Sequence, residues 1–243
     1  MRTTVILLAS LIVAINVYSQ NPDEVLKKMD EVIYAPKDQT ISIKMTVYDK
    51  SGKSSVREAH TIQKGNSMRL FRFTSPASQA GIGILSLPND VMYLYMPAYE
   101  KERRIASSVK NQGFAGTDLS YDDMESKSYV LKYDAISLKS EGNDYVLELK
   151  PKPENKTDYS KLIVTLGKDN YYPKKIQYFD KANNQIKELN NLKIEKKDKY
   201  WVATLFEMKD LRKGTKTQLE FTSVKYDTGL SDDEFTVRKL IQK

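Results

Sequence analysis

Four carboxylates stand close together in the sequence, just after a loop that contains two glycines. They are Asp118, Asp122, Asp123 and Glu125. A pair of carboxylates can hydrolyse a glycosidic bond when an apolar setting raises the pKa of one and leaves the other ionised. A structural role explains the same residues without catalysis. Ser120 and Asp123 have the spacing of a helix capping box, and acidic side chains stabilise a helix N-terminus. We favour the structural role, keep a carboxylate hydrolase as the weakest functional hypothesis, and predict that the protein is not an enzyme.

Other catalytic groups are scarce. His60 is the single histidine, and there is no cysteine. A Ser-His-Asp triad would need a sharply presented serine, and the sequence has no Gly-x-Ser-x-Gly motif. The lack of cysteine excludes disulfides, thiol nucleophiles and a lipid-modified cysteine. We therefore expect no metal site and no cofactor, and we interpret His60 as a surface residue of a strand.

The loop from Gly113 to Gly116 reads Gly-Phe-Ala-Gly. It lacks the Lys-Ser/Thr continuation of a phosphate-binding loop, so we expect a mobile loop that presents Phe114. Arg103 and Arg104 precede the loop and could bind a phosphate or an acidic partner. An edge strand protected by its charges is an equally good interpretation.

The first residues have the pattern of a secretory signal peptide. Arg2 precedes an apolar run over residues 5–15, and Ser19 ends a segment suited to cleavage. The run is shorter than the roughly 20 residues that a transmembrane helix needs. We predict a signal peptide over 1–19, cleaved near Ser19, and a single domain over 20–243. An uncleaved anchor is the alternative.

The formal net charge is +7, and the lysines are spread along the chain. This distribution indicates a solvated surface, or weak attraction to anionic lipid head groups. No motif combines aromatic and basic residues as nucleic-acid-binding domains do. We therefore predict no nucleic-acid partner.

Strands dominate the expected secondary structure. Apolar residues at helical spacing predict one amphipathic helix over 23–34. Alternating apolar and polar residues between turn clusters predict strands over 40–48, 56–63, 68–74, 83–87, 91–96, 129–137, 145–150, 162–166, 174–179, 186–194, 202–208 and 217–226. A turn is expected at 76–80, and short helical pieces are expected after Ser120 and at 231–234. The pattern predicts an antiparallel sheet, a sandwich or a barrel.

Several of these strands carry apolar side chains on both faces. Phe71 and Phe73 share one face of their strand, Tyr93 and Tyr95 share one face of another, and Trp201 begins a third. Both faces of such strands need cover, and few helices are available to provide it. An antiparallel sheet curled around an apolar hollow, open to a lipid-like ligand, meets this need. An ordinary sandwich core is the alternative.

Short motifs along most of the chain follow a known order. They are FTSPA at 73–77, YLYMPA at 93–98, RRIASS at 103–108, GFAGTD at 113–118, SYDD at 120–123, YPKKIQYFD at 172–180, YWV at 200–202, EMKD at 207–210 and DDEFT at 232–236. In these motifs the chain resembles the LolA-like family of outer-membrane lipoprotein-sorting proteins, in the branch associated with large exporter-type membrane proteins. Each motif alone is weak, but their order and spacing together are fairly specific.

The resemblance implies a mainly β fold with a few helices, an unclosed (half) antiparallel β-barrel of the LolA/LolB type with a helical lid over a hydrophobic cavity. It implies a periplasmic carrier that binds acyl chains of lipoproteins or other lipids and transfers them towards the outer membrane. An inner-membrane transporter and an outer-membrane acceptor would be its partners, and we expect a monomer. A non-carrying periplasmic accessory or sensor module that docks on an inner-membrane transporter is the alternative.

The strand pattern and the resemblance together suggest site residues. We predict that an apolar ligand cavity is lined by Phe71, Phe73, Leu85, Tyr93, Tyr95, Phe114 and Trp201. We predict that the lid or a partner is contacted by Arg103, Arg104, Gly113, Gly116 and Tyr121. The best-studied carriers of this family close the lid with a specific arginine, for which the candidates here are Arg69, Arg72, Arg103 and Arg104. The RRI motif at 103–105 and the GFAG motif at 113–116 belong to the exporter-associated branch and not to the best-studied carriers. The ligand could therefore be a hopanoid or a phospholipid instead of a lipoprotein.

Overall fold

The computed structural model describes residues 20–242, and the predicted signal peptide at 1–19 lies outside this range. The strands found in the described range are β1 (Asp38–Tyr48), β2 (Ser54–Lys64), β3 (Met68–Ser75), β4 (Gly83–Leu87), β5 (Val91–Met96), β6 (Lys101–Arg104), β7 (Tyr133–Glu141), β8 (Asp144–Pro151), β9 (Lys161–Gly167), β10 (Pro173–Phe179), β11 (Gln185–Lys197), β12 (Tyr200–Asp210) and β13 (Thr215–Tyr226). The α-helices found there are α1 (Pro22–Ile33), α2 (Tyr121–Met124), α3 (Tyr129–Lys132) and α4 (Val237–Ile241). Short 3-10 turns lie at Pro97–Tyr99, Ser107–Val109 and Asp232–Glu234.

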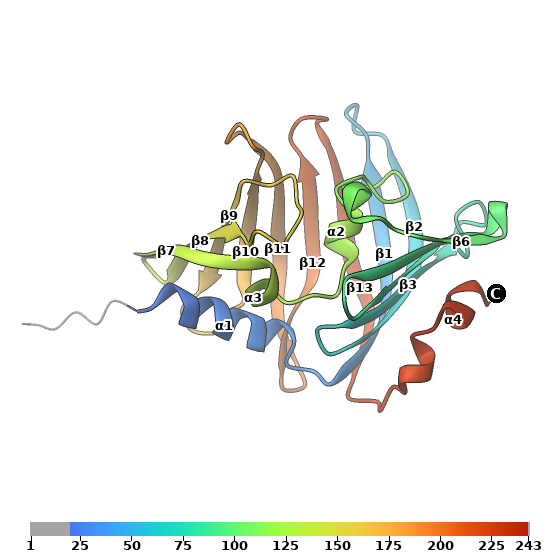
Figure 1. Cartoon of the computed structure of the whole chain (residues 1–243), viewed down its shortest axis with the longest axis horizontal. Helices are drawn as coiled ribbons and strands as arrows, with labels where there is room; N and C mark the ends of the chain where they lie inside the picture. The colour runs from blue at the N-terminus through green and yellow to red at the C-terminus, as the bar shows by residue number, and fades with distance from the viewer. Residues whose placement is uncertain (1–19, 243) are drawn as a thin grey trace, which may run out of the picture.

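Within residues 20–242, all thirteen strands belong to one antiparallel sheet. Their order is β6-β5-β4-β3-β2-β1-β13-β12-β11-β10-β9-β8-β7. The two edge strands, β6 and β7, do not pair with each other, so the curved sheet stays open (Figure 1). The predicted fold class, an unclosed antiparallel β-barrel with a few helices, is confirmed.

The alternation of side chains along the strands separates two hydrophobic clusters. In β1, Ile41, Ile43 and Met45 are buried, and Lys44 between them is exposed. In β3, Phe71 belongs to the large core cluster, whereas its neighbour Leu70 belongs to a smaller cluster. Successive residues of a strand point to opposite faces. The sheet therefore has one face turned to the main core and another turned outward.

Three helices lie over the inner face of the sheet. α1 packs against β7, β8, β12 and α3, and its buried residues Val25, Leu26 and Met29 form one apolar stripe. Figure 1 shows α1, α2 and α3 on the same side of the sheet. We call α2, α3 and the C-terminal end of α1 the lid. α4 instead packs against β4 and β5. No helix in residues 20–242 combines the length and the hydropathy needed to cross a membrane.

The prediction of a strand over 129–137 is wrong at its beginning, where residues 129–132 form α3. The carboxylate of Asp30, in α1, accepts hydrogen bonds from the backbone N–H groups of Tyr129 and Val130. This contact replaces the missing side-chain cap of Ser128. Asp30 and Tyr129 are 99 residues apart in the chain, so the local sequence around residue 129 does not indicate that a helix begins there. Residues 76–80 form the expected turn, and β6 is the charged edge strand that was one of the two interpretations of Arg103 and Arg104. α4 was not predicted.

Candidate functional site

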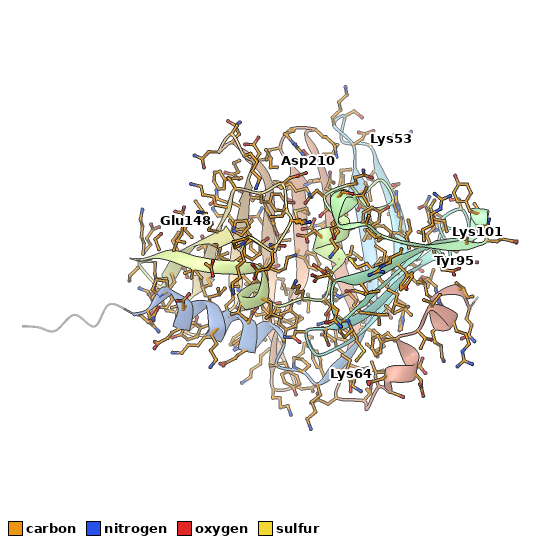
Figure 2. The ribbon with its side chains drawn as sticks, viewed as in Figure 1. Lys53, Lys64, Tyr95, Lys101, Glu148 and Asp210 are labelled. Carbon is orange, nitrogen blue, oxygen red and sulfur yellow. The ribbon has the colours of Figure 1, made fainter. Side chains whose placement is uncertain are left out.

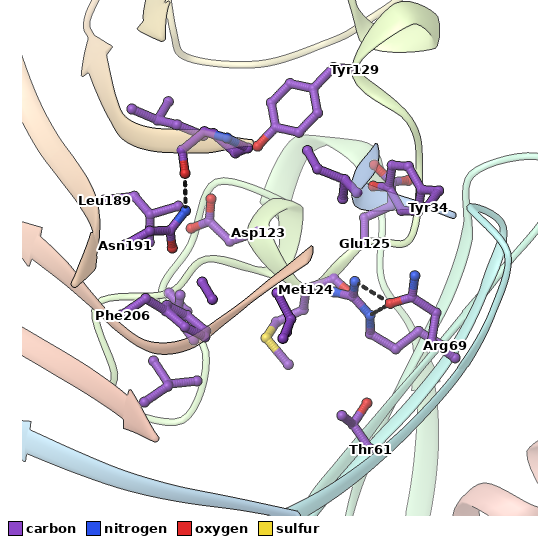
Figure 3. Close-up of a pocket in the computed structure, with 18 of the residues that line it drawn as sticks. Tyr34, Thr61, Arg69, Asp123, Met124, Glu125, Tyr129, Leu189, Asn191 and Phe206 are labelled. Atoms are coloured by element: carbon purple, nitrogen blue, oxygen red, sulfur yellow. Dashed lines mark hydrogen bonds between the residues drawn. The ribbon is translucent and has the colours of Figure 1, made fainter. Parts of the chain in front are cut away.

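A cavity of about 300 Å³ lies between the inner face of the sheet and the lid. β1, β3, β10, β12 and β13 each contribute lining side chains, and the lid contributes residues from all three of its parts. Figure 3 shows Met124 and Tyr129 of the lid facing Leu189 and Phe206 of the sheet across this space. Elements from both halves of the chain thus line the cavity.

The sheet side of the cavity is mostly apolar. Ile41 and Ile43 of β1, Leu219 of β13, Met208 of β12 and Ile176 of β10 line it, and all five are buried. Strand alternation brings these side chains to one face, as the sequence predicted for β1. The wall therefore offers a surface on which a hydrocarbon chain can lie without exposing it to water.

Polar groups lie at the β3 side of the cavity. Arg69 donates from Nε and Nη2 to Oε1 of Gln63, at 3.0 and 2.6 Å, and from Nη1 to the carbonyl oxygen of Met124 at 3.3 Å. Burial lowers the pKa of Arg69, and the nearby Tyr34, Tyr129 and Glu125 offset part of this effect. The Met124 contact joins the sheet to α2, so Arg69 is positioned to hold the lid.

A cluster of three lysines and three carboxylates lies beside the cavity. Lys110 Nζ lies 2.6 Å from Oε1 of Glu125, and Lys132 Nζ lies 2.7 Å from Oδ1 of Asp122 and 3.5 Å from Oε2 of Glu125. A further pair joins Lys187 of β11 to Asp123, at 3.2 Å. We call these six residues the ion-pair cluster. Their side chains are at most 10% exposed, and their formal charges cancel.

The ion-pair cluster accounts for most of the carboxylates that suggested catalysis. Ser120 and Asp123 form the predicted capping box, and both oxygens of Asp118 accept hydroxyl groups, from Thr215 and Thr217. Burial raises the pKa of Asp122 despite Lys132, whereas Lys187 and Ser120 outweigh burial and lower the pKa of Asp123. Such opposite shifts are typical of an acid–base pair. However, adjacent residues on a helix do not face each other, and these two carboxylates bind different lysines.

Phe71 and Trp201 are the two residues of the predicted cavity set that line the cavity. Phe73 and Phe114 do not line the cavity but pack beside Phe71 in the main core, where they are 0% and 1% exposed. Phe73 packs edge-on against Phe71, with ring centroids 5.0 Å apart, and is stacked on Phe114 at 5.6 Å. The expected presentation of Phe114 at the surface is therefore wrong, because its ring anchors the loop in the core.

Leu85, Tyr93 and Tyr95 lie on the other face of the sheet. They belong to the smaller cluster, together with Phe235 and Leu240 from the C-terminal segment. Tyr95 lies on the side of β5 where α4 packs (Figure 2). The C-terminal segment covers these side chains, so it provides the cover that a strand apolar on both faces needs.

The predicted lid or partner residues fall into two places. Arg103 and Arg104 lie on β6, an edge strand whose residues are all exposed, and Lys101 of this strand lies at the far end of the sheet (Figure 2). The loop of Gly113 and Gly116 closes through a bridge from Gly113 to Ser120, and Gly116 has a positive φ of 72°. Tyr121 packs on Phe114, with centroids 6.0 Å apart.

Many residues that line the cavity were not predicted from the sequence. Tyr34, Met124, Tyr129 and Tyr178 line the cavity but were not proposed. Tyr178 lies two residues after Ile176 in the predicted strand over 174–179, so both side chains share one face. The strand pattern could therefore have indicated Tyr178 as a cavity residue. The lid residues carry no comparable signal, since their positions depend on how α2 and α3 fold over the sheet.

Fold and site together define a class of protein, an open antiparallel β-barrel with a mainly apolar cavity beneath a helical lid. A family model described as "Uncharacterized protein" matches residues 65–242. Among solved structures, a DUF1329 family protein from Desulfovibrio piger is 29% identical, with a TM-score of 0.84 over 90% of this chain and 97% of that one. A search of curated proteins finds no match.

Two further solved structures indicate the wider group. A putative outer membrane lipoprotein-sorting protein domain from Vibrio parahaemolyticus is 25% identical, with a TM-score of 0.80 over 91% of this chain and 100% of that one. A LolA superfamily protein from Nitrosomonas europaea shares the fold, with a TM-score of 0.76, 18% identity and coverage of 91% and 100%. The chain belongs to the family whose model it matches over residues 65–242, and it has the LolA-like fold.

Proposed function

We propose that this protein is a periplasmic carrier that binds acyl chains of lipoproteins or other lipids in the cavity and transfers them towards the outer membrane. The observation that carries the proposal is the cavity itself, with its apolar sheet wall and its lid. A filled sandwich core would leave no comparable space. The likeness to the lipoprotein-sorting domain from Vibrio parahaemolyticus supports the same function.

The size of the cavity suggests how such a carrier would work. At roughly 30 Å³ for a group the size of a water molecule, about 300 Å³ holds on the order of ten methylenes. Burial of each CH₂ contributes about 0.8 kcal/mol, so a segment of this length would gain about 8 kcal/mol. Several long acyl chains would need more room, and the lid would have to move outward to provide it.

Arg69 is the best candidate for the arginine that closes the lid. Its Nη1 donates to the Met124 carbonyl of α2. Arg72 instead donates to carbonyls of Lys239 and Leu240 in α4, and Arg103 and Arg104 are exposed on β6. On this proposal, a donor or acceptor protein in either membrane opens the lid by breaking the Arg69 contact.

The localisation and the remaining partners form part of the proposal. A signal peptide over 1–19 would export the chain, and a monomeric domain would then shuttle between an inner-membrane transporter and an outer-membrane acceptor. Cargo transfer of this kind requires no covalent chemistry, which agrees with the pairing of the acidic residues near the cavity.

The decisive experiment is native mass spectrometry of the protein purified from its own periplasm, followed by organic extraction of whatever is bound. A lipid or an acylated protein at one equivalent or more supports the carrier and identifies its cargo. A protein that is empty and also rejects added amphiphiles contradicts it.

A docking module without cargo is the second candidate. The observation that favours it is β6, whose free edge and four exposed residues could receive a strand of a transporter. Replacement of Arg103 and Arg104 by glutamate should then abolish co-purification with the transporter while leaving bound lipid unchanged.

A further inference from the structure

Arg69 differs from the other cations beside the cavity. Its guanidinium is bonded to two neutral acceptors, Gln63 Oε1 and the Met124 carbonyl oxygen. In residues 20–242 no carboxylate forms an ion pair with it, whereas each of the lysines in the ion-pair cluster has a carboxylate partner within 3.2 Å. The chain thus neutralises these buried lysines and leaves Arg69 without a counter-charge in direct contact.

Nearby acidic groups do not provide a counter-charge in contact with Arg69. Glu125 acts on Arg69 only through charge, and its own oxygens already lie against Lys110 and Lys132. Figure 3 shows Arg69, Tyr34 and Glu125 on the same side of the cavity, with Thr61 on the neighbouring strand. The surroundings of Arg69 are therefore polar, in contrast to the wall formed by Ile41, Ile43 and Leu219.

The guanidinium also keeps hydrogen-bonding capacity. An arginine side chain has five N–H donors in a planar fork. Nε, Nη1 and Nη2 each use one N–H for the bonds described above, so one N–H on Nη1 and one on Nη2 have no acceptor among the described residues. Two N–H groups on neighbouring nitrogens match the paired oxygens of a carboxylate or phosphate.

We propose that Arg69 is the head-group subsite of the cavity, and that the ligand is an amphiphile with an anionic phosphate or carboxylate group at one end. The anionic oxygens bind the Arg69 guanidinium, and the hydrocarbon chain lies along the apolar wall of β1, β13 and β12. This inference rests on the proposed carrier function and narrows its cargo. Arg69 is partly buried, and withdrawal of a cation from water without a counter-ion is costly. An anionic ligand would reduce that cost when it binds.

Isothermal titration calorimetry with four probes tests the subsite. Decyl phosphate, decanoate and decanol share a chain that fits the cavity and differ in the head group, and inorganic phosphate has no chain. We expect at least one of the two anionic amphiphiles to bind at least about ten-fold tighter than decanol, because hydrogen bonds to charged groups are strong. Inorganic phosphate should bind much more weakly than decyl phosphate.

Variants then assign the preference to Arg69. Arg69→Met keeps the length of the side chain and removes its charge, so decanol binding should persist while the anionic preference disappears. Arg104→Met, on the exposed edge strand, should behave as the wild type. If Arg69→Met does not fold, Arg69→Lys retains the charge and should keep part of the preference, since lysine lacks the fork.

The possible results separate the subsite from the carrier function. Equal binding of all three amphiphiles would overturn the anionic subsite and leave the carrier intact. Inorganic phosphate that binds as tightly as decyl phosphate would show a site for a free anion and overturn the lipid head group. Absence of binding by every amphiphile would contradict the carrier function as well.

Discussion

The Asp30 carboxylate caps α3 from another helix, with its Oδ1 accepting the backbone N–H of Tyr129 at 2.9 Å. Its second oxygen accepts the N–H of Val130 at 2.8 Å. The side chain thus ties α1 to the lid and satisfies two N–H groups that a helix start leaves unpaired. Lid stability and fold stability are therefore coupled at this residue.

Asp30→Ala should lower the free energy of unfolding by about 1–2 kcal/mol, the usual range for loss of a helix cap. Glu31→Ala is the matched control, because Glu31 is the neighbouring acidic residue and makes only an exposed ion pair to Lys27. Urea denaturation followed by circular dichroism measures both variants. A loss that is equal in the two variants would contradict the capping role.

The ion-pair cluster should be sensitive to the loss of one charge. Lys132→Met leaves Asp122 buried with no cation, and breaking a buried pair costs about 3–5 kcal/mol. Combining it with Asp122→Leu removes both charges and should recover much of that loss. Lys152→Met, which breaks a largely exposed pair with Asp134, should cost under about 1 kcal/mol.

The same denaturation experiment measures these variants. If the double variant were no more stable than Lys132→Met alone, the loss would come from packing of the lysine stem, and the ion pair would not be its cause.

Asp38 should contribute to acid sensitivity. Burial alone would raise its pKa, but hydrogen bonds from Thr228, Gly229 and Leu230 outweigh burial and lower the pKa below the usual value of 3.8. A carboxyl group with a lowered folded-state pKa stabilises the fold above its unfolded pKa, and this contribution disappears as the pH falls through the folded pKa.

Stability measured between pH 6 and pH 2 should therefore fall less steeply below about pH 4 for Asp38→Asn than for the wild type. The variant should also be less stable at neutral pH, since an amide offers one oxygen acceptor instead of two. Identical slopes for the two proteins would show that Asp38 does not supply this pH dependence.

Strand alternation explains which parts of the site were predictable. Phe71 and Phe73 lie two residues apart in β3, so the strand pattern predicted that they share a face. In the structure this face, which also carries Arg69, is turned inward. For Tyr93 the same pattern could not show whether the side chain lies on the inner or the outer face of the sheet. That choice depends on register, because Tyr93 pairs with Leu85 and Leu85 pairs with Leu70 of the outer cluster.

The lid was less predictable than the sheet. Its short helices depend on contacts between distant parts of the chain, such as Asp30 with Tyr129 and Lys187 with Asp123. Local sequence identified the capping box of Ser120 correctly, but it could not indicate that Met124 would lie over Arg69. Strand periodicity is a local property, whereas closure of the cavity is a tertiary one.

Two leucines of β11 allow a matched test of the cavity. Leu189 lines the cavity, whereas Leu192 lies on the same strand and is 52% exposed. Leu189→Trp should fill room for about two methylenes, which at about 0.8 kcal/mol each corresponds to an affinity loss of about ten-fold. Leu192→Trp adds the same side chain at the surface and should leave binding unchanged. Titration with decyl phosphate measures both, and equal affinity in the two variants would mean that the ligand does not occupy this cavity.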